Sequence, residues 1–162
     1  MNNQYIGKLG EQYAEKFLIS QNYKILERNF RSKFGEIDLI AFDYSKKEIA
    51  FVEVKTRTGT FFGEPEDAVT RLKERKIIKT ALYFLNSATK KESLSWRVDV
   101  IAVKLNRQNK LKGITHFKNI SLAHGTGLSG YKNGTSQTNI FWGNYRSSGW
   151  IFSNLLLLGK HY

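Results

Sequence analysis

The chain has 162 residues, about the size of one domain, and its 41% hydrophobic content excludes wholesale disorder. It contains no cysteine, which excludes a disulfide scaffold, a thiolate zinc site and a cysteine nucleophile, and no apolar run is long enough to cross a bilayer. Lysine and arginine number 26 against 14 acidic residues, a net charge of +12, so we expect a cytoplasmic protein with polyanionic partners and no membrane contact.

The first predicted element is a helix from Gln4 to about Ser20, where apolar residues recur at helical spacing. Gly7 and Gly10 lie inside this pattern, and glycines in such positions indicate close packing against another element. Three predicted strands follow at Tyr23–Phe30, Glu36–Phe42 and Glu48–Arg57. A short polar link between the second and third favours an antiparallel hairpin.

A second helix is predicted from about Pro65 to about Leu85, because proline and acidic residues favour a helix start. Its predicted buried face consists of Ala68, Leu72, Ile77, Ala81 and Leu85. Two further strands are predicted at Trp96–Leu105 and Gly113–Ile120. The order α-β-β-β-α-β-β indicates an α/β fold with a mixed β-sheet flanked by helices.

The composition changes near His124, after which the chain has no acidic residue and is rich in glycine, serine, asparagine and aromatic residues. We therefore expect a folded domain over residues 1–122 and an irregular extension over residues 123–162. The alternative for the extension is an arm whose aromatic side chains stack on unpaired bases.

Charged residues interrupt two of the predicted apolar strands. Asp38 lies in the second strand, and Glu53 and Lys55 lie in the third, where alternation points both toward the same face. If the strands pair, Asp38 and Glu53 approach each other on one surface. Burial of such charges costs several kcal/mol each unless they are paired or bind a metal.

Two carboxylates and a lysine suit metal-assisted hydrolysis of a phosphodiester. Carboxylate oxygens bind hard cations such as Mg²⁺ or Mn²⁺, which can polarise the phosphodiester and activate a water molecule. The ammonium of Lys55 can orient that water or neutralise charge on the phosphate. The alternative is a partly exposed ion pair at the sheet edge, which spacing alone leaves equally open.

The spacing from Asp38 to Glu53-Val54-Lys55 resembles the PD-(D/E)xK signature of the restriction-endonuclease-like superfamily, although Ile37 stands where a proline is common. More specifically, several blocks in order over about residues 5–120 resemble the bacterial YraN-like family. These blocks include Gly7-Lys8-Leu9-Gly10-Glu11-Gln12-Tyr13-Ala14, Asn29-Phe30-Arg31, Gly35-Glu36-Ile37-Asp38-Leu39-Ile40, Phe51-Val52-Glu53-Val54-Lys55-Thr56-Arg57 and Arg97-Val98-Asp99-Val100. That family is an uncharacterised group of predicted nucleases, similar to archaeal Holliday junction resolvases.

The resemblance implies a restriction-endonuclease-like fold and a metal-dependent DNA endonuclease, with branched or single-stranded DNA as candidate substrates. It implies that Asp38 and Glu53 hold Mg²⁺ or Mn²⁺, that Lys55 assists the nucleophile, and that Glu11 on the first helix adds a further metal ligand. Glu15 shares a helix face with Glu11, so solvent exposure of Glu11 is the alternative. Resolvases of this kind act as two-fold dimers, so a homodimer is expected by analogy.

Basic residues near the predicted site are candidates for phosphate contacts. They are Arg28, Arg31, Lys33, Arg57, Lys73, Arg75 and Lys76. We interpret Glu36 as solvated or paired with a basic neighbour, and Asp99 as a structural partner of Arg97. The rival functions are a non-catalytic nucleic-acid-binding module with the same fold and a subunit that recruits a protein.

Overall fold

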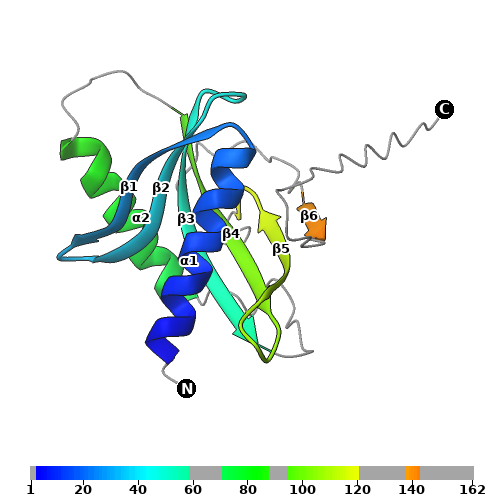
Figure 1. Ribbon diagram of the computed structural model, residues 1–162. Helices are drawn as coiled ribbons and strands as arrows, with labels where there is room; N and C mark the ends of the chain where they lie inside the picture. The colour runs from blue at the N-terminus through cyan, green and yellow to red at the C-terminus, as the bar shows by residue number, and fades with distance from the viewer. Residues whose placement is uncertain (1–2, 59–70, 88–94, 121–137, 143–162) are drawn as a thin grey trace.

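A six-stranded β-sheet lies between two helices in the computed structural model, which describes residues 3–58, 71–87, 95–120 and 138–142 (Figure 1). The helices are α1 (Asn3–Ser20) and α2 (Arg71–Ser87). The strands are β1 (Tyr23–Ser32), β2 (Gly35–Asp43), β3 (Glu48–Thr58), β4 (Ser95–Leu105), β5 (Leu111–Phe117) and β6 (Thr138–Trp142). None of the described helices is both long enough and apolar enough to span a membrane.

The strands lie side by side in the order in which they occur in the chain. β1, β2 and β3 form an antiparallel meander, with a bulge in β1 between Ile25 and Glu27. β4 runs parallel to β3 and comes after α2 in the chain, whereas β5 and β6 add antiparallel pairs. A parallel neighbour requires a crossover of this kind. The predicted α/β class, with a mixed sheet and the order α-β-β-β-α-β-β, is confirmed.

Each face of the sheet packs against one helix, because side chains alternate along the strands. On one face, Ala14, Phe17 and Leu18 of α1 pack with buried strand residues such as Val52 and Ile101. On the other face, Ile77 and Ala81 of α2 pack with strand residues that include Ile40 and Phe51. In Figure 1, α1 crosses the face toward the viewer and α2 lies behind the sheet. The two helices thus cover opposite faces of the sheet.

A buried ionic cluster joins four strands and centres on Arg97 at the start of β4. Its guanidinium donates hydrogen bonds to Asp43 of β2 at 2.9 Å, to Glu48 of β3 at 2.6 Å and to Asp99 at 3.0 Å. Asp99 also lies 2.9 Å from Nε2 of His116 in β5. The structural interpretation of Arg97 and Asp99 therefore agrees with the geometry, since these bonds tie strands distant in sequence.

Several local predictions differ from the structure. Of the predicted buried face of α2, Ile77 and Ala81 are buried, but Leu72 is 67% exposed, and Ala68 lies outside the described residues. β5 ends at Phe117 rather than at Ile120, because Asn119 has a φ of 52° and its amide turns to Asp99. Residues 138–142, predicted to be irregular, form β6 along β5. The predicted helix start at Pro65 lies outside the described residues.

Candidate functional site

The candidate site begins where β2 and β3 separate. The two strands pair from Asp43↔Glu48 to Leu39↔Val52, and beyond that point β3 continues to Thr58 without β2. At the fork, the carboxylate of Asp38 accepts a hydrogen bond of 2.7 Å from the backbone amide of Val54. A side chain therefore replaces the strand–strand hydrogen bond that is lost there.

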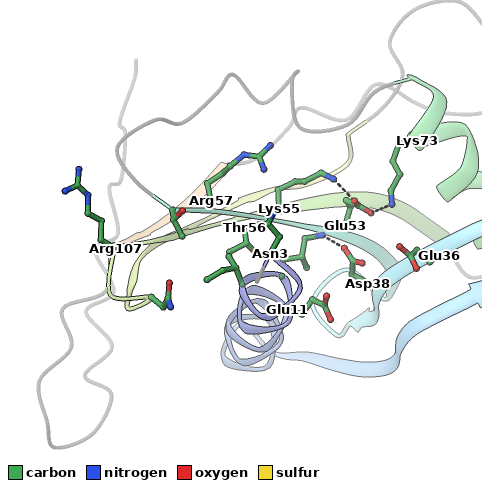
Figure 2. Close-up of a pocket in the computed structure, with 15 residues that line it drawn as sticks. Asn3, Glu11, Glu36, Asp38, Glu53, Lys55, Thr56, Arg57, Lys73 and Arg107 are labelled. Carbon is green, nitrogen blue, oxygen red and sulfur yellow. Dashed lines mark hydrogen bonds and ion pairs between the residues drawn. The ribbon is translucent and has the colours of Figure 1, made fainter. Parts of the chain in front are cut away.

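A cleft of about 770 Å³ opens at this fork (Figure 2). It is bounded by the first half of α1, the diverging strands, the start of α2 and the turn between β4 and β5. Its charged lining residues are Glu11, Glu36, Asp38, Glu53, Lys55, Arg57, Lys73 and Arg107. Figure 2 shows Arg107 at the opposite end of the cleft from the carboxylates, with Arg57 between Arg107 and Lys55. The cleft therefore has an acidic end and a basic end.

Glu53 is the most deeply buried carboxylate of the cleft, with a side chain only 4% exposed. Its Oε1 accepts a hydrogen bond of 2.7 Å from Lys55 Nζ, so Glu53 and Lys55 do share a face of β3. Its Oε2 lies 3.4 Å from Lys73 Nζ of α2 but has no hydrogen-bond partner. Two lysines from different elements thus surround one buried carboxylate.

Glu11 reaches the cleft from α1 because the helix packs very closely on β3 at the preceding residue. A Cβ atom on Gly10 would lie 1.8 Å from Oγ1 of Thr56, so only glycine fits there. The close packing predicted for Gly10 is confirmed, whereas Gly7 has no neighbour within 4 Å of the corresponding position. Glu15, one turn along, instead forms a bidentate ion pair with Arg28 at 2.6 and 2.9 Å.

The surroundings of Asp38 in the cleft disfavour its charged form. Burial raises the pKa of Asp38 to about 6, and the negative charges of Glu53 and Glu11 act in the same direction. The amide of Val54 and the ammonium of Lys73 oppose this shift in the pKa. Such crowding of acids in a cleft is typical of functional sites, where a cation or a proton relieves the repulsion.

The acidic end of the cleft fits a divalent cation in its donor chemistry. Asp38, Glu53 and Glu11 supply hard oxygen donors, and Oε2 of Glu53 is buried without a hydrogen bond. Within the described residues, no three Asp, Glu or His side chains form a ready-made ligand group. Mg²⁺ does not require one, because it usually binds through one or two carboxylates, several waters and substrate phosphates.

The cleft brings together all four predicted catalytic residues, Glu11, Asp38, Glu53 and Lys55, together with Arg57 and Lys73 from the predicted phosphate contacts. The other basic candidates do not line it. They are Arg28, Arg31, Lys33, Arg75 and Lys76. Arg28 pairs with Glu15, and Arg31 lies 3.5 Å from Glu36, the pairing expected for that glutamate.

Sequence reasoning missed Arg107 and Asn109, which line the basic end of the cleft from the turn between β4 and β5. In this turn Asn109 adopts a φ of 60° and the Asn106 side chain accepts two backbone hydrogen bonds, an arrangement that the sequence pattern did not indicate. The sequence also gave no sign that Lys73 contacts Glu53. The approach of Arg107 and Asn109 to the cleft and the contact between Lys73 and Glu53 both depend on the parallel crossover, which brings residues distant in sequence together.

Comparison with known sequences bears on this arrangement. The profile of the uncharacterised protein family UPF0102 matches residues 10–103, which include the fork, α2 and most of β4. The chain belongs to this family. The YraN-like membership expected from the motifs is thereby confirmed.

Three UPF0102 proteins illustrate the similarity. One from Caldanaerobacter subterraneus subsp. tengcongensis is 43% identical over 120 residues, covering 74% of this chain and 96% of the relative. One from Clostridium botulinum strain Loch Maree is 44% identical over 117 residues, covering 72% and 94%. One from Trichlorobacter lovleyi is 50% identical over 103 residues, covering 64% and 80%. The match thus covers most of the length of each of these relatives. It covers about two thirds to three quarters of this chain.

Proposed function

We propose that this UPF0102 protein is a metal-dependent nuclease that hydrolyses DNA phosphodiesters, with branched or single-stranded DNA as its candidate substrates. The observation that carries the proposal is the fork itself, where Asp38, Glu53 and Lys55 meet Glu11 in one cleft. A structural ion pair, the alternative function of these residues, would need only one acid and one base. Here several acids share one end of an open cleft, where burial first, and then the charges of Glu53 and Glu11, raise the pKa of Asp38 to about 6.

Asp38 and Glu53 would hold Mg²⁺ or Mn²⁺, with Glu11 as a further ligand. Bound there, the cation would supply Lewis-acid activation of the phosphodiester and of the attacking water. The chain holds these acids firmly in place, since Val54 fixes Asp38 and the Gly10–Thr56 contact fixes α1. A carboxylate that is already oriented loses little freedom when it binds a ligand.

Lys55 and Lys73 both lie beside Glu53 in the cleft. The side chain of Lys55 is 30% exposed and lines the cleft beside Glu53, where its ammonium can orient a water molecule or stabilise charge on the phosphate. Lys73 approaches the same carboxylate from α2. Arg57 and Arg107, at the basic end, can contact the phosphates on one side of the cut.

Cleavage assays on matched DNA substrates test the proposal. Labelled linear, flapped, four-way and single-stranded DNA are incubated with the purified full chain in Mg²⁺, in Mn²⁺ or in chelator. We expect metal-dependent cutting that falls by about 100-fold or more in Asp38→Ala and in Lys55→Ala. Glu27→Gln, an exposed acid on β1 outside the cleft, is the control and should cut normally.

Binding of Mn²⁺, followed by electron paramagnetic resonance, provides a readout that does not depend on cutting. We expect the wild type to bind the ion, and Glu53→Gln to bind it more weakly. Salt-sensitive DNA binding with no cutting of any substrate and no Mn²⁺ binding would overturn the nuclease and favour the non-catalytic nucleic-acid-binding module.

A further inference from the structure

Two aromatic rings stand exposed side by side at the tip of the β1–β2 hairpin and on α2. Phe34 is 37% exposed and Tyr83 is 46% exposed, and their ring centroids lie 6.2 Å apart. Phe30 lies beneath Tyr83 at 6.5 Å and continues through Phe84 into the core. The exposed pair is thus the outer end of a cluster of aromatic side chains that extends inward to the core.

The hairpin tip is fixed against α2, so the pair does not depend on a mobile loop. Gly35 has a φ of 154°, a conformation available to glycine, and a Cβ added there would lie 3.4 Å from Cβ of Lys76. Ser32 Oγ lies 3.3 Å from Thr80 Oγ1 and accepts a hydrogen bond from the amide of Phe34. A surface that is already ordered loses little entropy when it binds a partner.

Three lysines lie near the two rings, one beside Phe34 and two on the same helix as Tyr83. Lys33 Nζ lies 5.2 Å from the centroid of the Phe34 ring. Lys76 and Lys79 are exposed on α2 and precede Tyr83 at helical spacing, so the three residues share one side of the helix. We use the term aromatic platform for Phe34, Tyr83, Lys33, Lys76 and Lys79. Exposed rings interleaved with lysines are typical of surfaces that bind single-stranded nucleic acid.

The platform adjoins the candidate site along two elements. Phe34, in the turn directly before β2, precedes Asp38 by four residues, about 13 Å at the usual strand rise of about 3.3 Å per residue. Glu36, between them, lines the cleft, as does Lys73, which lies one helical turn before Lys76. A strand that lies on the platform can therefore continue into the cleft.

We propose that the aromatic platform binds unpaired bases of a DNA strand whose backbone continues into the cleft, which rests on the proposed function for what occurs there. Phe34 and Tyr83 would stack with bases, and Lys33, Lys76 and Lys79 would contact the phosphates. Paired bases already stack on each other, so a duplex must unstack before it can use the rings. The platform therefore favours single-stranded segments next to the cut.

Fluorescence anisotropy in chelator measures this binding without cleavage. The probes are a labelled oligothymidine strand and a duplex of the same length. We expect Phe34→Leu and Tyr83→Leu each to weaken binding of the single strand by about tenfold and to leave duplex binding nearly unchanged. Tyr83→Trp, which keeps an aromatic ring, should restore binding of the single strand.

Tyr44→Leu is the matched control. Its ring is 51% exposed and packs on Phe42 at 5.2 Å, but it lies in the turn between β2 and β3, at the other end of β2. We expect it to bind both probes like the wild type. Thermal unfolding of each leucine variant checks that the hairpin still packs on α2.

The outcome separates this proposal from the nuclease. Unchanged single-strand binding in both leucine variants, or an equal loss on strand and duplex, would overturn the platform and leave the cleavage assay unaffected. Selective loss of single-strand binding in a protein that cuts nothing would support the platform and overturn only the nuclease.

Discussion

The carboxylate of Asp38 accepts a 2.7 Å hydrogen bond from the amide of Val54, just beyond the last paired residues of β2 and β3. This hydrogen bond links the two strands at the point where they diverge. It also keeps a carboxylate partly buried beside Glu53, where an isolated charge is unfavourable. The burial of Asp38 at the fork, which this hydrogen bond only partly offsets, therefore makes the fold less stable at neutral pH.

Asp38→Asn should raise the free energy of unfolding at pH 8, measured in chelator by denaturant titration, by about 1–3 kcal/mol. Burial first, and then Glu53, raises the pKa of Asp38 from 3.8 to about 6 in the folded state. The folded protein therefore holds the Asp38 proton more tightly than the unfolded chain. The resulting penalty is complete above pH 6 and disappears below pH 3.8.

The difference between Asp38→Asn and the wild type should accordingly shrink as the pH falls from about 6 to about 4. Asn can still accept the hydrogen bond from Val54, so the substitution preserves the fork. A variant that is less stable than the wild type at pH 8 would contradict the account of Asp38.

Lys73→Met should raise the pKa of Asp38 further, and Glu53→Gln should lower it, because the Lys73 charge opposes the shift and the Glu53 charge adds to it. Carbon-detected NMR titration of the carboxyl groups measures both changes. Lys76→Met, one turn along α2 and outside the cleft, should leave the pKa of Asp38 where it is. Equal effects of Lys73→Met and Lys76→Met would show that net charge, not the ion pair in the cleft, is responsible.

Gly10→Ala should destabilise the fold by about 1–3 kcal/mol, because the new Cβ meets Thr56 Oγ1 at 1.8 Å and pushes α1 away from β3. Thermal or denaturant unfolding measures the loss. The Thr56→Ala substitution removes the closest atom and should restore part of the stability in the double variant.

Gly7→Ala provides the contrast within the same helix. No atom lies within 4 Å of the added Cβ, so helix propensity alone should raise stability by up to about 1 kcal/mol. Similar losses at both glycines would mean that the contact with Thr56 is not the cause.

Arg97→Met should cost about 3–5 kcal/mol of stability, because Asp43 and Asp99 would then remain buried without their shared cation. Chemical denaturation measures the change. Arg28→Met removes an ion pair that is largely exposed, and the stability should hardly change. Comparable losses in the two variants would contradict the importance of burial.

Much of the fork was predictable from local patterns. Asp38, Glu53 and Lys55 interrupt apolar strands, and strand alternation was sufficient to place Glu53 and Lys55 together. The two glycines inside a helical pattern predicted close contacts, and the structure has one at Gly10 but not at Gly7. These predictions depend only on short-range geometry, which a sequence carries directly.

The remaining parts depend on contacts between distant segments. Lys73 reaches Glu53, and Arg107 reaches the cleft, only after β4 has paired in parallel with β3. α2 packs on the sheet through Ile77 and Ala81 and leaves Leu72 exposed, and the sequence pattern distinguished neither Leu72 from the buried positions nor β6 from the irregular extension. Packing rather than propensity decides such positions.

The bulge in β1 has a consequence for aggregation. β1 is the outermost strand on its side of the sheet, and an exposed edge invites another chain to add a strand. Here the break between Ile25 and Glu27 interrupts the regular backbone, and exposed charges follow the edge at Lys24, Glu27, Arg28 and Arg31. Such features discourage strand addition, so this edge resists both amyloid-like stacking and the joining of two copies into one continuous sheet.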